Sequence, residues 1–201
     1  MAATLAGEQG MEIEELVTVL PGQDSFMYHY PNAPLAMYPA SILGLKWASV
    51  GEGAVADYLA EKARDGVECV ISGAVESEYQ KTRIERMCVE NGMLSLNPLW
   101  RKSHDLILEE IERRGIRAII VSVSAEGLGT ELLGKEIDSS LVDTLRSVHR
   151  KHGISLIGEG GEYETFVTGW AGSKKSVRIM ESHKVVNGLT GLLYLDRLEV
   201  A

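Results

Sequence analysis

Hydrophobic residues recur along the chain with spacings that switch between strand-like and helix-like. Alternating or continuous apolar runs predict strands, whereas apolar residues three or four positions apart predict helices. The predicted strands cover 13–20, 45–50, 67–73 and 116–124, and the predicted helices cover about 35–43, 53–66, 77–91, 103–114 and 139–152. This alternation predicts an α/β domain, doubly wound around a mainly parallel sheet.

Two apolar runs are expected to be buried strands of that sheet. The run "VECVISG" at 67–73 is almost continuous, which is typical of a strand covered on both faces. The run "ISLI" at 154–157 is predicted to be the last parallel strand, and "GEGGEYET" at 158–165 follows it directly.

From residue 162 onward the pattern changes to strand candidates joined by Gly and Asn turns. They are "YETFVTGW", "SVRIMESHKVV" and "TGLLYLDRLEV". We expect a small antiparallel β-rich extension of the same folded unit. The predicted organisation is a nucleotide-binding α/β domain at 1–157 and a C-terminal substrate-site and β-rich part at 158–201.

Composition narrows the class of partner. The chain has 201 residues, 45% of them hydrophobic, which is sufficient for a substantial core. Its net charge of −9 disfavours direct binding to nucleic-acid phosphates or to an anionic membrane. Cys69 and Cys88 lack a CxxC spacing, so we interpret them as buried thiols in a reducing compartment. The N-terminus has no signal-peptide pattern, and we expect a cytoplasmic protein without a membrane segment.

The stretch "SGAVESEYQKTRIER" at 72–86 begins where a predicted strand ends and a helix begins. In open α/β sheets, ligands bind outside the carboxyl ends of the strands. Gly73 lets a ligand approach the backbone, and Ser77 is a predicted helix N-cap. The alternative reading is a capped surface helix whose charges pair four residues apart, as in Lys81 with Glu85.

A second loop, "DSFMYHYPN" at 24–32, is dense in aromatic and polar residues, but nothing near His29 in the sequence makes it a general base. The preceding "PGQDS" at 21–25 lacks the paired glycines and the lysine of a phosphate-binding loop. We therefore assign no phosphate site there.

The segment "GEGGEYET" combines three glycines with three carboxylates. Its glycines predict a tight turn, and its glutamates would repel an anion. The pattern suits a cation, a metal held by oxygen ligands, or an amine that loses a proton. A glycine turn followed by an exposed charged strand is the structural alternative. We assign no metal site from the sequence.

Taken together, "GEGGEYETF", "SGAVESEYQKTRIER", "NPLW" (97–100) and "DSFMYHYPN" resemble the diphthine-ammonia ligase family of adenine nucleotide alpha hydrolase-like ATP pyrophosphatases. The resemblance runs from about residue 3 to the C-terminus in matching order. It implies a Rossmann-like nucleotide-binding fold of the HUP type and a cytoplasmic ligase that uses ATP with Mg²⁺.

The reaction that the resemblance implies is amidation of diphthine, a modified histidine of translation elongation factor 2. The carboxylate is activated as an acyl adenylate with release of pyrophosphate, and ammonia then displaces AMP to give diphthamide. The partners implied are elongation factor 2 bearing diphthine, and ammonium. Diphthine carries a quaternary ammonium group, which carboxylates and aromatic faces can bind.

Residue roles follow from the matching motifs. The implied catalytic residues are Glu159, Glu162 and Glu164, which would hold ammonium or the cationic substrate and take up the proton. The residues expected to border the nucleotide are Ser72, Gly73 and Ala74. Those expected around the substrate are Glu78, Tyr79, Gln80, Arg83, Gly158, Gly160, Gly161, Tyr163 and Thr165.

The chain departs from the family pattern at one point. Family members open with a strand and a glycine-rich "SGGKDS" phosphate loop, and this sequence contains neither. We expect the first strand and loop to be missing through truncation. The alternatives are a non-catalytic relic that keeps a substrate cleft, and a related ATP pyrophosphatase acting on another carboxylate or on a tRNA base.

Overall fold

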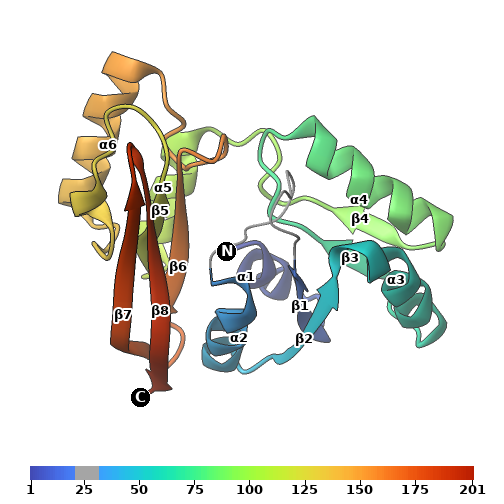
Figure 1. The fold of residues 1–201 in the computed structure, drawn as a ribbon. Coiled ribbons are helices and arrows are strands. Elements are labelled where there is room, and N and C mark those ends of the chain that lie inside the picture. Colours follow the sequence, from blue (N-terminus) through green and yellow to red (C-terminus); the bar gives the residue numbers. More distant parts are fainter. Residues whose placement is uncertain (21–31) are drawn as a thin grey trace. The chain divides into compact units, whose positions relative to one another are not determined.

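The computed structural model describes residues 1–20 and 32–201, which form two compact units (Figure 1). Unit 1 comprises Met1–Pro34 and Leu45–Lys102, and unit 2 comprises Leu35–Gly44 and Ser103–Ala201. The division after Lys102 differs from the boundary expected after residue 157. The aromatic loop at 24–32, including His29, lies outside the described residues apart from Asn32.

Unit 1 alternates strands and helices as the sequence predicts. Its elements are α1 (Ala2–Glu8), β1 (Glu15–Leu20), β2 (Lys46–Gly51), a 3₁₀ turn (Glu52–Ala54), α3 (Val55–Arg64), β3 (Cys69–Ile71), α4 (Glu78–Glu90) and β4 (Leu94–Leu96). Helix α3 is followed by Gly66 with a φ of 94°, a left-handed conformation that glycine adopts without strain. The glycine-terminated helix expected at 53–66 is therefore confirmed.

The strands of unit 1 pair in parallel, but as two separate pairs. β1 pairs with β2, and β3 pairs with β4. Both pairs contribute to one core, in which Val50 from β2 and Leu59 from α3 lie with the fully buried Cys88 from α4. The residues of β3 are half-buried, so the burial expected on both of its faces is not seen in the described part of the chain.

Unit 2 is built around an antiparallel sheet. Its elements are α2 (Met37–Leu43), α5 (His104–Arg113), β5 (Arg117–Val123), a 3₁₀ turn (Thr130–Leu132), α6 (Ser139–His152), β6 (Tyr163–Gly169), β7 (Val177–Asn187) and β8 (Thr190–Val200). A 3₁₀ turn (Ala33–Ala36) spans the division between the units and leads into α2. The strand order is β6-β5-β8-β7.

Strand β5 was expected in the parallel sheet and instead pairs antiparallel with β6 and β8. Its apolar run correctly indicated burial, since Ile120 and Val123 are fully buried. Burial on both faces does not specify strand direction, which explains the wrong assignment. The C-terminal strands β6, β7 and β8 are antiparallel as expected. They form one four-stranded sheet together with β5.

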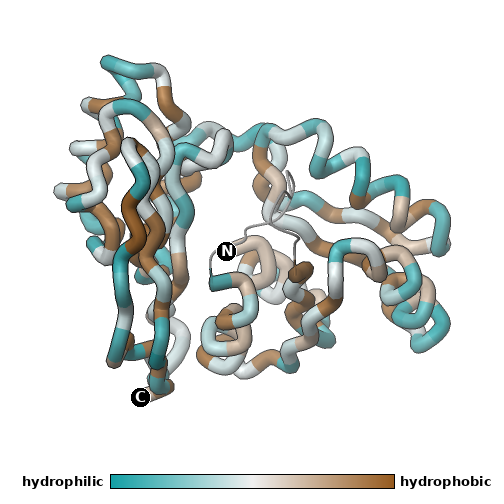
Figure 2. Tube along the Cα trace, in the orientation of Figure 1, coloured by the Kyte–Doolittle hydropathy of each residue, from teal (hydrophilic) through white to brown (hydrophobic). Residues whose placement is uncertain are grey.

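The core of unit 2 lies between this sheet and its helices. Leu141 and Leu145 of α6, Leu108 of α5 and Ile42 of α2 all join the apolar cluster formed by the strands. Figure 2 shows the hydrophobic positions concentrated in the strands, while the helices alternate between hydrophobic and hydrophilic residues. The helices thus bury one face each, as their spacing predicted.

The predicted strand "ISLI" at 154–157 is wrong, because these residues form an irregular segment that ends in a turn at Leu156 and Ile157. The Ser155 hydroxyl accepts hydrogen bonds from the backbone N–H groups of Ile157 (3.3 Å) and Glu159 (3.2 Å). Such local side-chain bonds compete with strand pairing. Ile154 and Leu156 are nevertheless buried, so their apolar character reflects packing in the core.

Both cysteines were expected to be buried, but Cys88 is buried whereas Cys69 is half-buried. Cys69 and Cys88 are free thiols, and burial raises the pKa of each. Among the described residues, no helix is both long and apolar enough to cross a bilayer.

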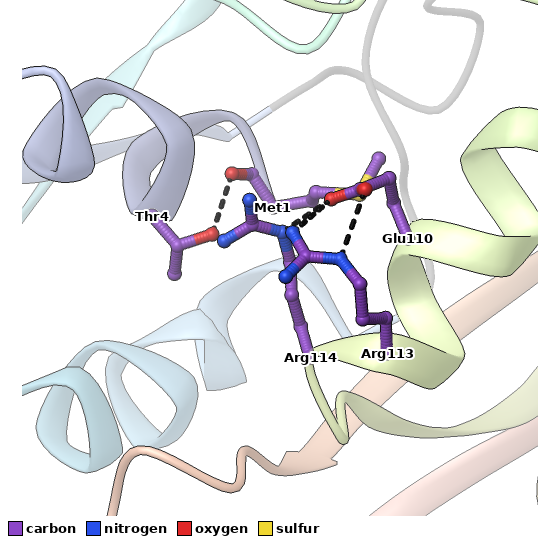
Figure 3. A network of polar contacts seen from close by, with 5 residues as sticks. All are labelled: Met1, Thr4, Glu110, Arg113 and Arg114. Atoms are coloured by element: carbon purple, nitrogen blue, oxygen red, sulfur yellow. Dashed lines mark hydrogen bonds and ion pairs between the residues drawn. The ribbon is translucent and has the colours of Figure 1, made fainter.

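A buried arginine ends helix α5. The Arg114 side chain is only 5% exposed and its Nε donates to Glu110 at 2.9 Å, whereas Arg113, which is 62% exposed, binds the same carboxylate at 2.8 Å. Figure 3 shows both guanidinium groups directed at Glu110. Hydrogen bonds from the two arginines lower the pKa of Glu110 to about 2.

This pair predicts an acid-dependent loss of stability. The pKa of Glu110 is lower in the folded state than its ordinary value of 4.5, so the pair stabilises fully above that value and is lost as pH falls toward 2. Glu110→Gln should lower the melting temperature at pH 7, and its difference from the parent should shrink between pH 4.5 and 2. Thermal melts across this pH range measure the difference in melting temperature between the variant and the parent. A difference that does not change with pH would contradict the lowered pKa of Glu110.

Arg113 provides a matched control for Arg114. Arg114→Met should lower the melting temperature more than Arg113→Met, because only Arg114 is buried with its charge. Equal effects of the two substitutions would show that burial of the guanidinium is unimportant.

Candidate functional site

The predicted nucleotide-bordering residues lie where β3 and β4 end in unit 1. Because these strands are parallel, their carboxyl ends meet at one edge, and the loops that follow them are bonded together. The Ser72 hydroxyl donates to Asn97 Oδ1 at 2.5 Å, and the Ser72 N–H donates to the Leu96 carbonyl at 2.9 Å. The loop after β3 is therefore held by the loop after β4.

Gly73 and Ala74 differ in how they face a ligand. A side chain at Gly73 would meet no atom within 4 Å, so its backbone is open to approach. The Ala74 side chain is buried, and the Ala74 N–H donates to the Ser72 hydroxyl at 3.3 Å. Of the three residues predicted to border the nucleotide, Gly73 leaves the most room for a bound nucleotide.

The first turns of α4 carry the predicted substrate residues. Ser77 caps the helix by accepting from the Gln80 N–H at 3.3 Å, which confirms the predicted N-cap. Tyr79 is exposed, and its hydroxyl accepts from Arg83 at 3.0 Å. Lys81 pairs with Glu85 at 2.6 Å, as the surface-helix reading expected.

Sequence reasoning missed the role of Trp100 at this edge. Its ring lies 5.3 Å from Lys81 Nζ and 5.2 Å from Arg101 Cζ, and Arg101 also binds Glu78 at 2.9 Å. The signal available in the sequence was the tryptophan of "NPLW" at 97–100, which was used only for the family resemblance.

The glycine-rich turn lies in unit 2, at the carboxyl end of β5. Antiparallel pairing brings the start of β6 to this end, since Tyr163 pairs with Val123. Ser124 makes two hydrogen bonds to the turn. Its N–H donates to the Glu162 carbonyl (2.9 Å), and its hydroxyl donates to the Gly161 carbonyl (2.6 Å). The turn was correctly expected at a carboxyl edge, although the strand is β5 rather than 154–157.

Glu162 holds this turn together with its own carboxylate. One oxygen accepts from the Ser155 N–H at 2.7 Å and the other from the Gly160 N–H at 2.9 Å. Charge-assisted bonds of this kind are stronger than bonds between neutral groups. Glu162, which was expected to hold ammonium or the cationic substrate, therefore binds the backbone of its own loop.

Two glycines of the turn have left-handed backbone angles, φ 72° at Gly158 and φ 79° at Gly161. A side chain at Gly158 would also collide with the Tyr163 carbonyl oxygen, whereas one at Gly161 would meet open space. Glycine is thus required at Gly158 for two separate reasons.

The remaining predicted residues of the turn divide into buried and accessible ones. Tyr163 is buried, its hydroxyl donates to the Leu156 carbonyl at 2.7 Å, and burial raises its pKa. That environment leaves no aromatic face for a ligand. Glu159 and Glu164 are half-buried and Thr165 is exposed, with Glu164 paired to Ser122 of β5 in the sheet.

Within each unit the predicted residues gather in one place, around the β3 and β4 ends in unit 1 and in the turn at the β5 end in unit 2. In the part of the chain with described coordinates, no three His, Cys, Asp or Glu side chains lie close enough to hold a metal ion. The chemistry offered by the described residues is that of hydrogen bonds, carboxylates and an aromatic ring.

Comparison with known proteins gives matches over nearly the whole chain. Residues 1–95 match the diphthamide synthase N-terminal domain, and residues 103–200 match the diphthamide synthase C-terminal domain. The match to the C-terminal domain begins at residue 103, directly after Lys102, where the structure divides into its two units.

Individual relatives carry the name diphthine-ammonia ligase. The Bos taurus protein is 36% identical over 144 residues, which cover 69% of this chain and 53% of that protein. The Homo sapiens protein is 36% identical over 143 residues, with the same coverage, and the Schizosaccharomyces pombe protein is 35% identical over 129 residues, covering 64% of this chain and 21% of that protein. The matched segment thus spans about half the length of the mammalian relatives. With both domain matches in order, the chain belongs to the diphthamide synthase family.

Proposed function

We propose that this chain takes part in the ATP-dependent amidation of diphthine on elongation factor 2. The diphthine carboxylate attacks the α-phosphorus of ATP, pyrophosphate leaves, and an acyl adenylate forms. Ammonia then attacks the acyl carbon, AMP leaves, and a proton passes to a carboxylate. The ordered match to both diphthamide synthase domains carries this proposal.

The turn at the β5 end supplies the carboxylates for the amine half of the reaction. Glu159 and Glu164 are assigned to holding ammonium and accepting its proton. Glu162 is assigned to positioning, because both of its oxygens accept backbone N–H bonds within the turn. This division of roles refines the sequence-based assignment, in which Glu159, Glu162 and Glu164 all served to hold ammonium or the cationic substrate and to take up the proton.

The loop after β3 is assigned to the nucleotide. Gly73 has an open backbone position, and the hydrogen bond between Ser72 and Asn97 fixes the loop. The chain contains no "SGGKDS" segment, so this assignment concerns the border of the nucleotide and not its phosphates. Mg²⁺ would arrive with the ATP phosphates and stabilise their charge.

The amidation is tested with the chain extended at its N-terminus by the strand and "SGGKDS" loop of the family, incubated with diphthine-bearing elongation factor 2, Mg·ATP and isotope-labelled ammonium. We expect the label to appear in the factor, with AMP and pyrophosphate released in equal amounts. Mass spectrometry of the factor and separation of the nucleotides measure both. Failure of a folded chain to incorporate label would contradict the proposal.

The two glutamates of the turn should respond differently to the same change. Glu159→Gln should reduce the amidation rate by about 10²-fold or more, as expected for loss of a proton acceptor, and should lower the melting temperature less than Glu162→Gln does. Glu162→Gln should lower stability by about 1–3 kcal/mol, since an amide NH₂ would face a backbone N–H. Thermal melts and initial rates separate the roles, and the same behaviour from both variants would refute the division.

The geometry of the turn can be tested with its glycines. Gly158→Ala should destabilise the protein by about 1–3 kcal/mol and reduce amidation, through both a left-handed φ and a carbonyl collision. Gly161→Ala places alanine at a similar left-handed φ but causes no collision, so it should lower the free energy of unfolding by less. Denaturant titration of the two variants gives the comparison; an equal cost would remove the collision as a cause.

A further inference from the structure

The cluster of Trp100, Lys81, Arg101, Glu78 and Glu85 in unit 1 has no part in the roles assigned so far to nucleotide or ammonia. Two cationic groups lie within 5.3 Å of the Trp100 ring centre, inside the range at which a cation is attracted to an aromatic face. Each cation also has a carboxylate partner, Glu85 for Lys81 and Glu78 for Arg101. Two positively charged side chains therefore lie close to the Trp100 ring.

The two cations are held differently. Lys81 is 23% exposed and bonded at 2.6 Å to a carboxylate on its own helix. Arg101 is 61% exposed and its partner Glu78 is 65% exposed, so solvent screens that pair and it contributes little to stability. Arg101 is thus the cation that a ligand can replace at low cost.

A ligand that replaces Arg101 would meet an aromatic ring and a carboxylate. A quaternary ammonium group suits this pair, because it is weakly hydrated and binds tryptophan faces well. An anion is disfavoured, because each of the two cations near the ring is already bonded to a carboxylate, Lys81 to Glu85 and Arg101 to Glu78. We propose that Trp100 and Glu78 form a binding site for a quaternary ammonium group, which Arg101 occupies in the free protein.

The position of the cluster fits a substrate role. The Arg101 N–H donates to the Val75 carbonyl at 2.9 Å, so the cluster is joined to the loop that begins at Ser72. The proposal rests on the proposed function in one respect, namely that the ligand is the trimethylammonium group of diphthine. It places that group beside the nucleotide-bordering loop of unit 1.

The site is tested directly with tetramethylammonium chloride as the probe. The chain has three tryptophans, so indole N–H resonances in a two-dimensional NMR spectrum report each ring, and Trp100→Phe assigns the one of interest. We expect a saturable shift of the Trp100 signal alone, with sodium chloride at equal ionic strength causing none. No saturable shift at Trp100 in the folded protein would overturn the proposal.

Variants define the two partners of the probe. Glu78→Gln should weaken tetramethylammonium binding by roughly threefold or more, because the carboxylate is lost. Arg101→Gly should tighten it, because the resident cation is removed. Glycine is suited to this position, since Arg101 has a left-handed φ of 58°. Unchanged or weaker binding by the glycine variant would overturn the role given to Arg101.

Arg86→Ala is the matched control. Arg86 pairs with Glu90 on the same helix at 2.8 Å, and its substitution should leave the probe affinity unchanged. The binding measurement needs neither ATP nor the factor, so it fails independently of the amidation assay. Amidation without tetramethylammonium binding would refute this site alone, whereas binding without amidation would refute the proposed reaction alone.

Discussion

Burial of six of the seven residues of strand β5, all except Arg117, is the constraint on which unit 2 depends. Ile120 and Val123 are removed from solvent entirely, which requires a strand on each side of β5 and helices over the sheet. β6 and β8 provide the strands, and α2, α5 and α6 contribute to the core. Because β6 runs antiparallel to β5, the same pairing brings the glycine-rich turn to the β5 end, where Ser124 can bind it.

The excess of glycine and charge in that turn has a physical explanation that does not require a ligand at every carboxylate. A tight turn leaves backbone N–H groups without partners from secondary structure. The Glu162 carboxylate accepts two of them, and the Ser155 hydroxyl accepts two more. These four N–H groups are therefore satisfied within the turn, and the Glu162 carboxylate serves the structure of the loop.

Local signals made most of the fold predictable from sequence. Helix α6 occupies 139–152 as predicted, because Asp138 caps its start and Gly153 adopts a left-handed φ of 73° at its end. The direction of β5 was not predictable, because it depends on which distant strands pair with it. The turn at 154–157 was missed, because buried apolar residues look alike in a strand and in a packed loop.

The candidate site was predictable in its motifs and less so in its roles. The residues from 72 to 83 and from 158 to 165 do gather at strand ends, as the α/β pattern indicated. A sequence could not reveal that Tyr163 is turned into the core or that Glu162 binds its own backbone. One consequence concerns chain length. Because a single carboxylate ties Ser155 to Gly160, an inserted residue would break both bonds, so this loop must keep a fixed number of residues, unlike most loops.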